Sequence, residues 1–102
     1  PNEQIHLLQI IREALNNVVK HARATQARVQ LRSLEDGEVM VEIDDDGIGL
    51  PDDAQKTHHF GLSIMHERAA CLGGTLLLQS RPGCGVNVHL RFRPAAREQI
   101  SP

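Results

Sequence analysis

Early in the chain, several polar residues share one side of a predicted helix. On a helical wheel, where successive residues are ~100° apart, four polar residues fall within one arc of about 100° that does not overlap the apolar stripe. They are Glu13, Asn17, Lys20 and His21. Glutamate and asparagine oxygens one turn apart suit a hard cation, and a lysine one turn further on suits a phosphate. A solvated helix face would show the same polar line, so this set alone leaves both interpretations open.

Three consecutive aspartates end a predicted strand. Side chains alternate along a strand, so Asp45 shares a face with Ile43, while Asp44 and Asp46 point the other way. A carboxylate in phase with core residues is costly to bury unless a donor meets it, and the exocyclic amine of a bound base would be such a donor. An acidic surface turn is the alternative interpretation.

Gly47 and Gly49 follow these aspartates and would let the backbone approach a flat ligand, because they carry no Cβ. Segment 42–53 also loosely imitates an EF-hand calcium loop. That interpretation is disfavoured, because a strand precedes the segment and Asp53 stands where a bidentate glutamate is usual.

Two further glycine segments could serve a ligand site. Gly61 leaves free backbone amides at a predicted helix N-terminus, which is a ready anion site. The preceding His58 and His59 are adjacent and therefore chelate a metal poorly, so exposed loop residues are the favoured interpretation. Segment 83–85, Gly-Cys-Gly, is fully explained by a tight hairpin.

Composition excludes several classes of function. The 102 residues carry a net charge of -2, and Phe60 and Phe92 are the only aromatic residues, so neither a basic surface nor a stacking platform for nucleic acid is present. Cys71 and Cys84 fit no disulfide framework and no zinc motif. No apolar run approaches the ~18 residues of a membrane span, so we expect no membrane contact by this domain.

Hydrophobic periodicity predicts the elements that position these residues. One helix spans residues 3–22, and its expected core stripe is Leu8, Ile11, Leu15, Val18 and Ala22. A second helix buries Leu62, Met65, Ala69 and Leu72. Alternating patterns predict strands at 26–34, 39–43, 75–80 and 86–92, with a long loop at 44–60. The order α-β-β-loop-α-β-β predicts an α+β two-layer sandwich, with a mainly antiparallel sheet and the helices on one face.

In their order and spacing these segments resemble the N, G1, G2 and G3 boxes of the GHKL ATPases, a superfamily that includes histidine kinases, DNA gyrase, a heat-shock chaperone and MutL. Segment 12–22, REALNNVVKHA, resembles the N box of the nitrate/nitrite sensor (NarX and NarQ) branch of histidine kinases. Segment 45–49, DDGIG, fits that branch's D-x-G-x-G, and segment 59–69 matches its short G2 box and following helix. The resemblance covers about residues 3–94 and implies the Bergerat ATP-binding fold.

The resemblance also implies roles for the residues of the N box. Asn17 would hold Mg²⁺, and Glu13 would orient the metal or its water. Lys20 and His21 would approach the phosphates of ATP.

For the later boxes, the resemblance implies that Asp45 accepts a hydrogen bond from the adenine amino group and that Gly47 and Gly49 line the base. Segment 51–60 would form a mobile ATP lid. Residues at the end of that lid would also bind nucleotide, namely His59, Gly61 and Leu62. The G3 box departs from the family pattern, because Val86 stands where a threonine is usual.

The function implied is to bind Mg²⁺-ATP and present its γ-phosphate to a histidine on a separate dimerisation and phosphoacceptor domain, with a response regulator downstream. Residues 1–94 would be the cytoplasmic catalytic domain of a membrane-anchored sensor, lacking the helix and strand that usually precede the N box, and 95–102 a flexible tail. The alternatives are a protein-serine kinase of the anti-sigma-factor type and a regulatory module that only binds nucleotide.

Overall fold

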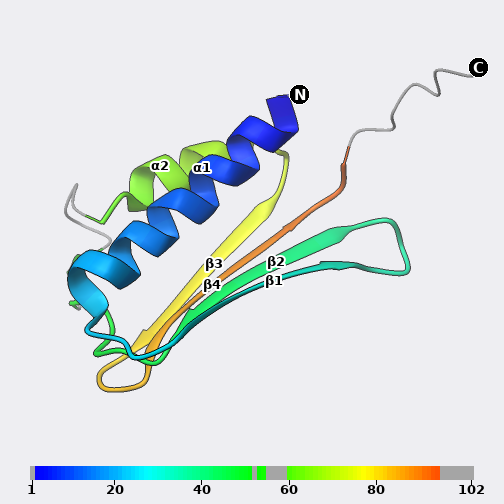
Figure 1. Ribbon diagram of the computed structural model, residues 1–102. Coiled ribbons are helices and arrows are strands. Elements are labelled where there is room, and N and C mark those ends of the chain that lie inside the picture. The colour runs from blue at the N-terminus through cyan, green and yellow to red at the C-terminus, as the bar shows by residue number, and fades with distance from the viewer. Residues whose placement is uncertain (1, 52, 55–59, 95–102) are drawn as a thin grey trace, which may run out of the picture.

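Two helices pack on one face of a four-stranded sheet (Figure 1). The computed structural model describes residues 2–51, 53–54 and 60–94. In chain order the elements are α1 (Asn2–Asn17), η1 (Val18–Ala22), β1 (Ala27–Ser33), β2 (Val39–Asp45), α2 (Leu62–Cys71), β3 (Thr75–Arg81) and β4 (Gly85–Phe92). The predicted tail at 95–102 and most of the predicted lid lie outside the described residues.

The sheet has the strand order β1-β2-β4-β3, and each neighbouring pair is antiparallel. Two hairpins, β1–β2 and β3–β4, meet at the central β2–β4 pair, and α2 lies on the connection between them. The predicted two-layer α+β sandwich with a mainly antiparallel sheet is therefore confirmed.

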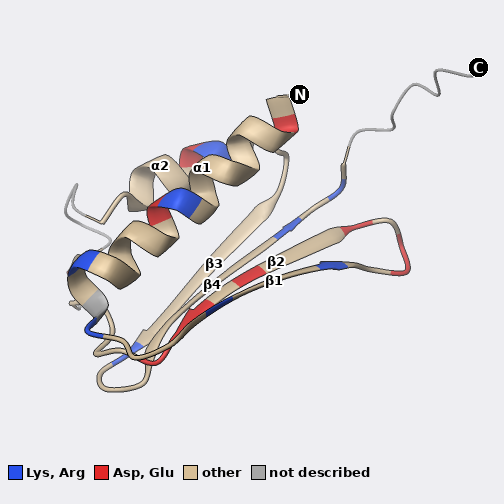
Figure 2. Cartoon of the chain, viewed as in Figure 1, with Lys and Arg blue, Asp and Glu red and all other residues tan. Residues whose placement is uncertain are grey.

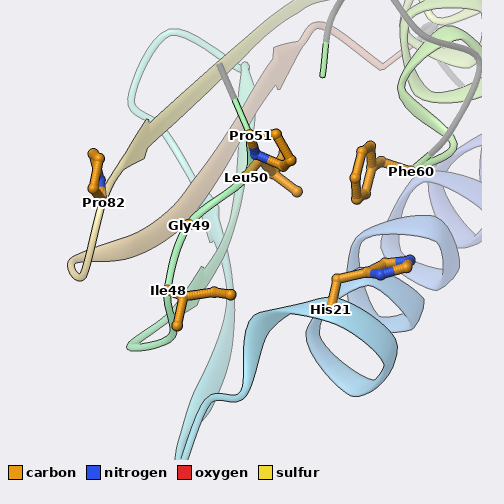
Figure 3. A pocket seen from close by; sticks show the side chains of 7 residues that line it. All are labelled: His21, Ile48, Gly49, Leu50, Pro51, Phe60 and Pro82. Atoms are coloured by element: carbon orange, nitrogen blue, oxygen red, sulfur yellow. The ribbon is translucent and has the colours of Figure 1, made fainter. Parts of the chain in front are cut away.

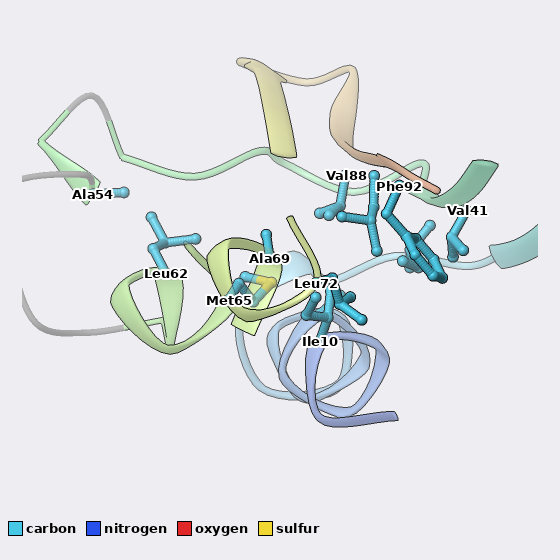
Figure 4. Packing of buried hydrophobic residues seen from close by; sticks show 12 residues of the cluster. Ile10, Val41, Ala54, Leu62, Met65, Ala69, Leu72, Val88 and Phe92 are labelled. Carbon is cyan, nitrogen blue, oxygen red and sulfur yellow. The ribbon is translucent and has the colours of Figure 1, made fainter. Parts of the chain in front are cut away.

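The core is almost wholly aliphatic and lies between the helices and the sheet (Figure 4). The predicted stripe of α2 is confirmed, since all four of its residues are buried. They meet side chains from the central strands, among them Val41, Ile43, Val88, Leu90 and Phe92. Burial of aliphatic surface is therefore what fixes the helix layer on β2 and β4.

The buried face of α1 differs from the predicted stripe. Leu8 is 63% exposed, whereas Ile10 is 0% exposed and Ala14 is buried. The prediction was wrong because apolar residues cover more than one face of this helix, so periodicity cannot select among them. Packing decides instead, because α1 has to contact both β2 and α2. Of the other expected members, Ile11 and Leu15 pack partly buried against the core.

The first strand forms as predicted, but the prediction that one of its faces is buried was wrong. Val29 and Leu31 point to the helix side of the sheet, opposite Ile43 and Val41, yet they are 44% and 58% exposed. The reason is that β1 lies at the edge of the sheet, while α1 packs on β2 and α2 on β3.

The opposite face of the sheet is polar. Acidic residues lie along β2, and arginines lie on the neighbouring strands β1 and β4 (Figure 2). Arg28 stands opposite Asp44, and the Arg91 guanidinium lies 2.6 Å from Glu38 Oε1. Exposed pairs of this kind contribute little to stability. Among the described helices, none combines the length and the apolar composition needed to span a membrane.

A pair of substitutions on α1 tests its orientation. Ile10→Ala should lower the free energy of unfolding by about 2–5 kcal/mol, because it empties a fully buried site. Leu8→Ala, on the exposed side, should change it by less than about 0.5 kcal/mol. Urea denaturation followed by circular dichroism measures both, and a larger loss for Leu8→Ala would contradict the packing described.

Candidate functional site

A cavity of about 470 Å³ opens between the C-terminal end of the first helix and the loop after β2. Figure 3 shows His21 and Phe60 on one side and Ile48, Leu50 and Pro51 on the other. Gly49 and Pro82 complete the lining. The volume and the largely apolar walls suit a small organic ligand.

The polar residues of α1 meet the chain just before α2 beside this cavity. Asn17 Nδ2 donates a hydrogen bond to the Phe60 carbonyl oxygen at 2.6 Å. One turn earlier, Glu13 Oε2 accepts a hydrogen bond from Gln9 Nε2 at 2.9 Å. Because the nitrogen end of the Asn17 amide is engaged, its Oδ1 is the end left to act as an acceptor or a metal ligand.

Gly61 is required where α2 begins. Its φ is +65°, and a Cβ there would lie 3.0 Å from Glu13 Cδ and closer still to Glu13 Oε1. A side chain at position 61 would therefore displace the Glu13 carboxylate. The next residue, Leu62, is buried in the core, so only its backbone can reach a ligand.

The last turn of the first helix is wider than an α-helix. Residues 18–22 form a π-helical turn that ends at Arg23, whose φ is +48°. Such turns are frequent at functional sites, and here the turn changes the direction of Lys20 and His21 from that of a regular helix. His21 packs edge-on against Phe60, with ring centroids 4.8 Å apart, and both His21 and Lys20 are exposed.

The aspartates at the end of β2 have distinct surroundings. Asp44 Oδ1 accepts a hydrogen bond from Asn87 Nδ2 on the open face of the sheet. Asp46 accepts hydrogen bonds from the Thr25 hydroxyl and from the Thr25 and Gln26 amides, and the Thr25 hydroxyl is the main cause that lowers its pKa. These two carboxylates therefore hold the surrounding chain in place.

The Asp45 carboxylate makes fewer hydrogen bonds than that of Asp46. Its Oδ1 accepts the Gly47 N–H at 2.8 Å, and Oδ2 has no hydrogen-bond partner within the described part of the chain. Asp45 does not line the cavity beside His21; it borders two neighbouring hollows at the end of the sheet, as does Asp44. Gly85 packs directly against the backbone of Asp45, since a Cβ at position 85 would lie 2.7 Å from the Asp45 carbonyl carbon.

The structure thus brings part of the predicted set together. Glu13, Asn17 and Gly61 meet at one border of the cavity, and His21 and Gly49 line it. Gly47 lies beside Asp45 rather than in the lining, and His58 and His59 fall outside the described residues. Sequence reasoning did not assign Ile48, Leu50 or Pro82 to the site, and their only signal was their place beside glycines in predicted turns.

A magnesium ion fits the donor set at this border. The Glu13 carboxylate and Asn17 Oδ1 are oxygen donors one turn apart, and Mg²⁺ typically takes one or two protein oxygens together with substrate phosphates. In the described ranges no group of three or more His, Cys, Asp or Glu side chains could hold a metal ion.

Comparison with known proteins decides the family. Residues 2–96 match the family described as "Histidine kinase-, DNA gyrase B-, and HSP90-like ATPase". The chain belongs to this family. The ATPase domain is 46% identical over 96 residues to the nitrate/nitrite sensor protein NarQ of Escherichia coli K12, and 38% identical over 93 residues to NarX of the same organism.

These alignments cover 94% and 91% of the chain but 17% and 15% of the two relatives, so the ATPase domain spans less than a fifth of their length. The signal transduction histidine-protein kinase/phosphatase UhpB of Salmonella typhimurium is 39% identical over 90% of the chain and 18% of its own length. The expected resemblance to the NarX and NarQ branch is confirmed.

Solved structures share the fold of the ATPase domain. A histidine kinase domain of Erythrobacter litoralis EL346 superposes with a TM-score of 0.79 at 21% identity, over 89% of this chain and 47% of that one. The Acinetobacter baumannii histidine kinase AdeS gives a TM-score of 0.74 at 18% identity, over 89% of this chain and 47% of that one. These similarities support the expected Bergerat-type sandwich.

Two glycines with the same backbone conformation provide a matched test of the Glu13 contact. Gly61 and Gly73 have φ of +65° and +64°, but a Cβ at Gly73 would meet nothing within 4 Å. Gly73→Ala should therefore cost only the ~1–2 kcal/mol of a left-handed residue, and Gly61→Ala should cost more because Glu13 must move as well. Equal losses in urea denaturation would show that the Glu13 contact imposes no constraint.

Proposed function

We propose that this ATPase domain binds Mg²⁺-ATP and presents the γ-phosphate to a histidine on a separate dimerisation and phosphoacceptor domain of a sensor histidine kinase. The observation that carries the proposal is the cavity with Glu13 and Asn17 at its border, since one ligand could contact an apolar wall and a pair of oxygen donors at once. The named functions of the relatives support the same reaction class.

The metal and phosphate side of the site would belong to the first helix and its π turn. Asn17 Oδ1 and Glu13 would hold or orient Mg²⁺, whose charge neutralises the phosphates during transfer. Lys20 and His21 follow within one turn and would contact the phosphates, where a lysine acts as a point charge. Catalysis of phosphoryl transfer is mainly positioning and charge stabilisation, so these residues need not form a covalent bond.

The base side would belong to the loop after β2. Asp45 would accept a hydrogen bond from the adenine amino group, because Oδ2 is the carboxylate oxygen without a described partner. Gly47 and Gly49 would allow the base to approach the backbone. His59, Gly61 and Leu62, at the end of the segment that precedes α2, would close the site from the other side through their backbone or ring.

The phosphoacceptor would lie on another domain. Three of the described histidines have other surroundings: His6 lies 3.2 Å from an Arg68 guanidinium nitrogen, His21 packs on Phe60, and His89 lies 3.8 Å from Glu42. A response regulator would take the phosphoryl group from the acceptor domain, and the whole system would work in the cytoplasm. The anti-sigma-factor type of serine kinase gains no support from the relatives named above.

Asparagine substitutions at adjacent aspartates test the base contact. In Asp45→Asn, the amide oxygen can still accept from Gly47 N–H, but the other end becomes a donor facing the adenine amino group. Since a hydrogen bond to a charged acceptor is worth about 1.5–3 kcal/mol, ATP affinity should fall roughly tenfold or more.

The control is Asp44→Asn, which changes the same charge on the open face of the sheet beside Asn87. Its ATP affinity should stay within about twofold of the wild type. Calorimetric titration with ATP measures both variants, and equal losses would reject Asp45 as the residue that recognises the base.

A further inference from the structure

The loop that forms one wall of the cavity is attached to the turn between β3 and β4. The Gly83 N–H donates to the Ile48 carbonyl oxygen at 3.1 Å, and a Cβ at Gly49 would lie 2.7 Å from the Arg81 carbonyl oxygen. Ile48, Gly49 and Leu50 all line the cavity, so its shape on this side depends on where the β3–β4 turn holds them.

Ser80 makes the side-chain contact within this attachment. Its Oγ accepts a hydrogen bond from the Leu50 N–H at 2.7 Å, and the same oxygen would lie 2.8 Å from a Cβ at Gly49. Ser80 follows Leu76 and Leu78 on the helix-facing side of β3, where both leucines pack against the core. A partly buried hydroxyl in this row costs desolvation unless it is hydrogen-bonded, and the Leu50 amide supplies that bond.

The cross-strand neighbour of Ser80 is Val86. Valine offers no side-chain donor or acceptor, so Ser80 provides the hydroxyl of this pair. Ser80 itself does not line the cavity, whereas Leu50 and Gly49 do. Any effect of Ser80 on a ligand must therefore pass through the loop.

We propose that Ser80 is a positioning residue of the nucleotide site, whose hydroxyl fixes the Leu50 amide and so holds Gly49 and Leu50 where they form the wall on the base side. The inference rests on the proposed nucleotide-binding function. It assigns to β3, an element outside the boxes that carry the resemblance, an indirect influence on affinity for the base, exerted through the loop.

The experiment compares three variants of the complete 102-residue chain with the wild type. Ser80→Ala removes the acceptor, Ser80→Thr keeps a hydroxyl, and Ser33→Ala makes the same change at an exposed serine at the end of β1. ADP in EDTA is the probe, because without Mg²⁺ its binding reports the base side rather than the metal. Calorimetry gives the affinity, and amide hydrogen exchange followed by NMR reports the Leu50 N–H directly.

We expect Ser80→Ala to weaken ADP binding about fivefold, because binding must then supply the free energy of ordering the loop that one net hydrogen bond supplied before, and to accelerate exchange at Leu50. Ser80→Thr should recover most of the affinity and the protection, and Ser33→Ala should match the wild type. A role in stability alone would lower the melting temperature of Ser80→Ala and leave the ADP affinity of the folded protein unchanged, which would overturn the inference.

Two other results would also overturn it. One is an equal loss of affinity in Ser80→Ala and Ser80→Thr. The other is an unprotected Leu50 amide in the wild-type chain, which needs no variant to fold. If the wild type binds neither ADP in EDTA nor ATP with Mg²⁺, the proposed function fails and this inference fails with it, whereas wild-type binding with unchanged affinity in Ser80→Ala rejects the inference alone.

Discussion

The site depends on backbone segments that approach their neighbours more closely than a side chain would permit. At Gly61, the start of α2 lies against the Glu13 carboxylate, and at Gly85, the start of β4 lies against the backbone of Asp45. Residues far apart in the chain are joined at these contacts: a helix to the segment before the next helix, and the end of one strand to the start of another. The first contact sets where the chain before α2 meets the groups proposed for the metal, and the second sets where β4 meets the residue proposed for the base.

How far the sequence predicts this arrangement depends on whether a pattern is local. The face of α2 was predictable because Leu62, Met65 and Ala69 form a single apolar stripe, and burial follows that stripe. The face of α1 was not, because apolar residues surround much of the helix and its packing partners choose among them. The exposure of Leu31 likewise depends on which strand lies at the edge, a property of the whole sheet.

In the candidate site, too, local features were predictable from the sequence and long-range contacts were not. Alternation along β2 correctly separated Asp45 from Asp44, since that is a local property of a strand. The contact of Ser80 with Leu50 joins residues 30 positions apart, and the bond of Asn17 to the Phe60 carbonyl joins residues 43 apart. Neither has a local signature. The resemblance suggested the roles proposed for Asn17 and Asp45, and the structure adds the hydrogen bonds that these side chains make.

The proposed function divides the reaction between two domains: this domain would supply nucleotide and metal, and another domain the histidine. The direct measurement is incubation of the chain with γ-³²P-ATP and Mg²⁺, alone and with the dimerisation and phosphoacceptor domain that belongs with it. We expect no label on this chain and acid-labile label on the added domain, because positioning of the acceptor can supply ~7–11 kcal/mol of the barrier. Stoichiometric, acid-labile phosphate on this chain alone would contradict it.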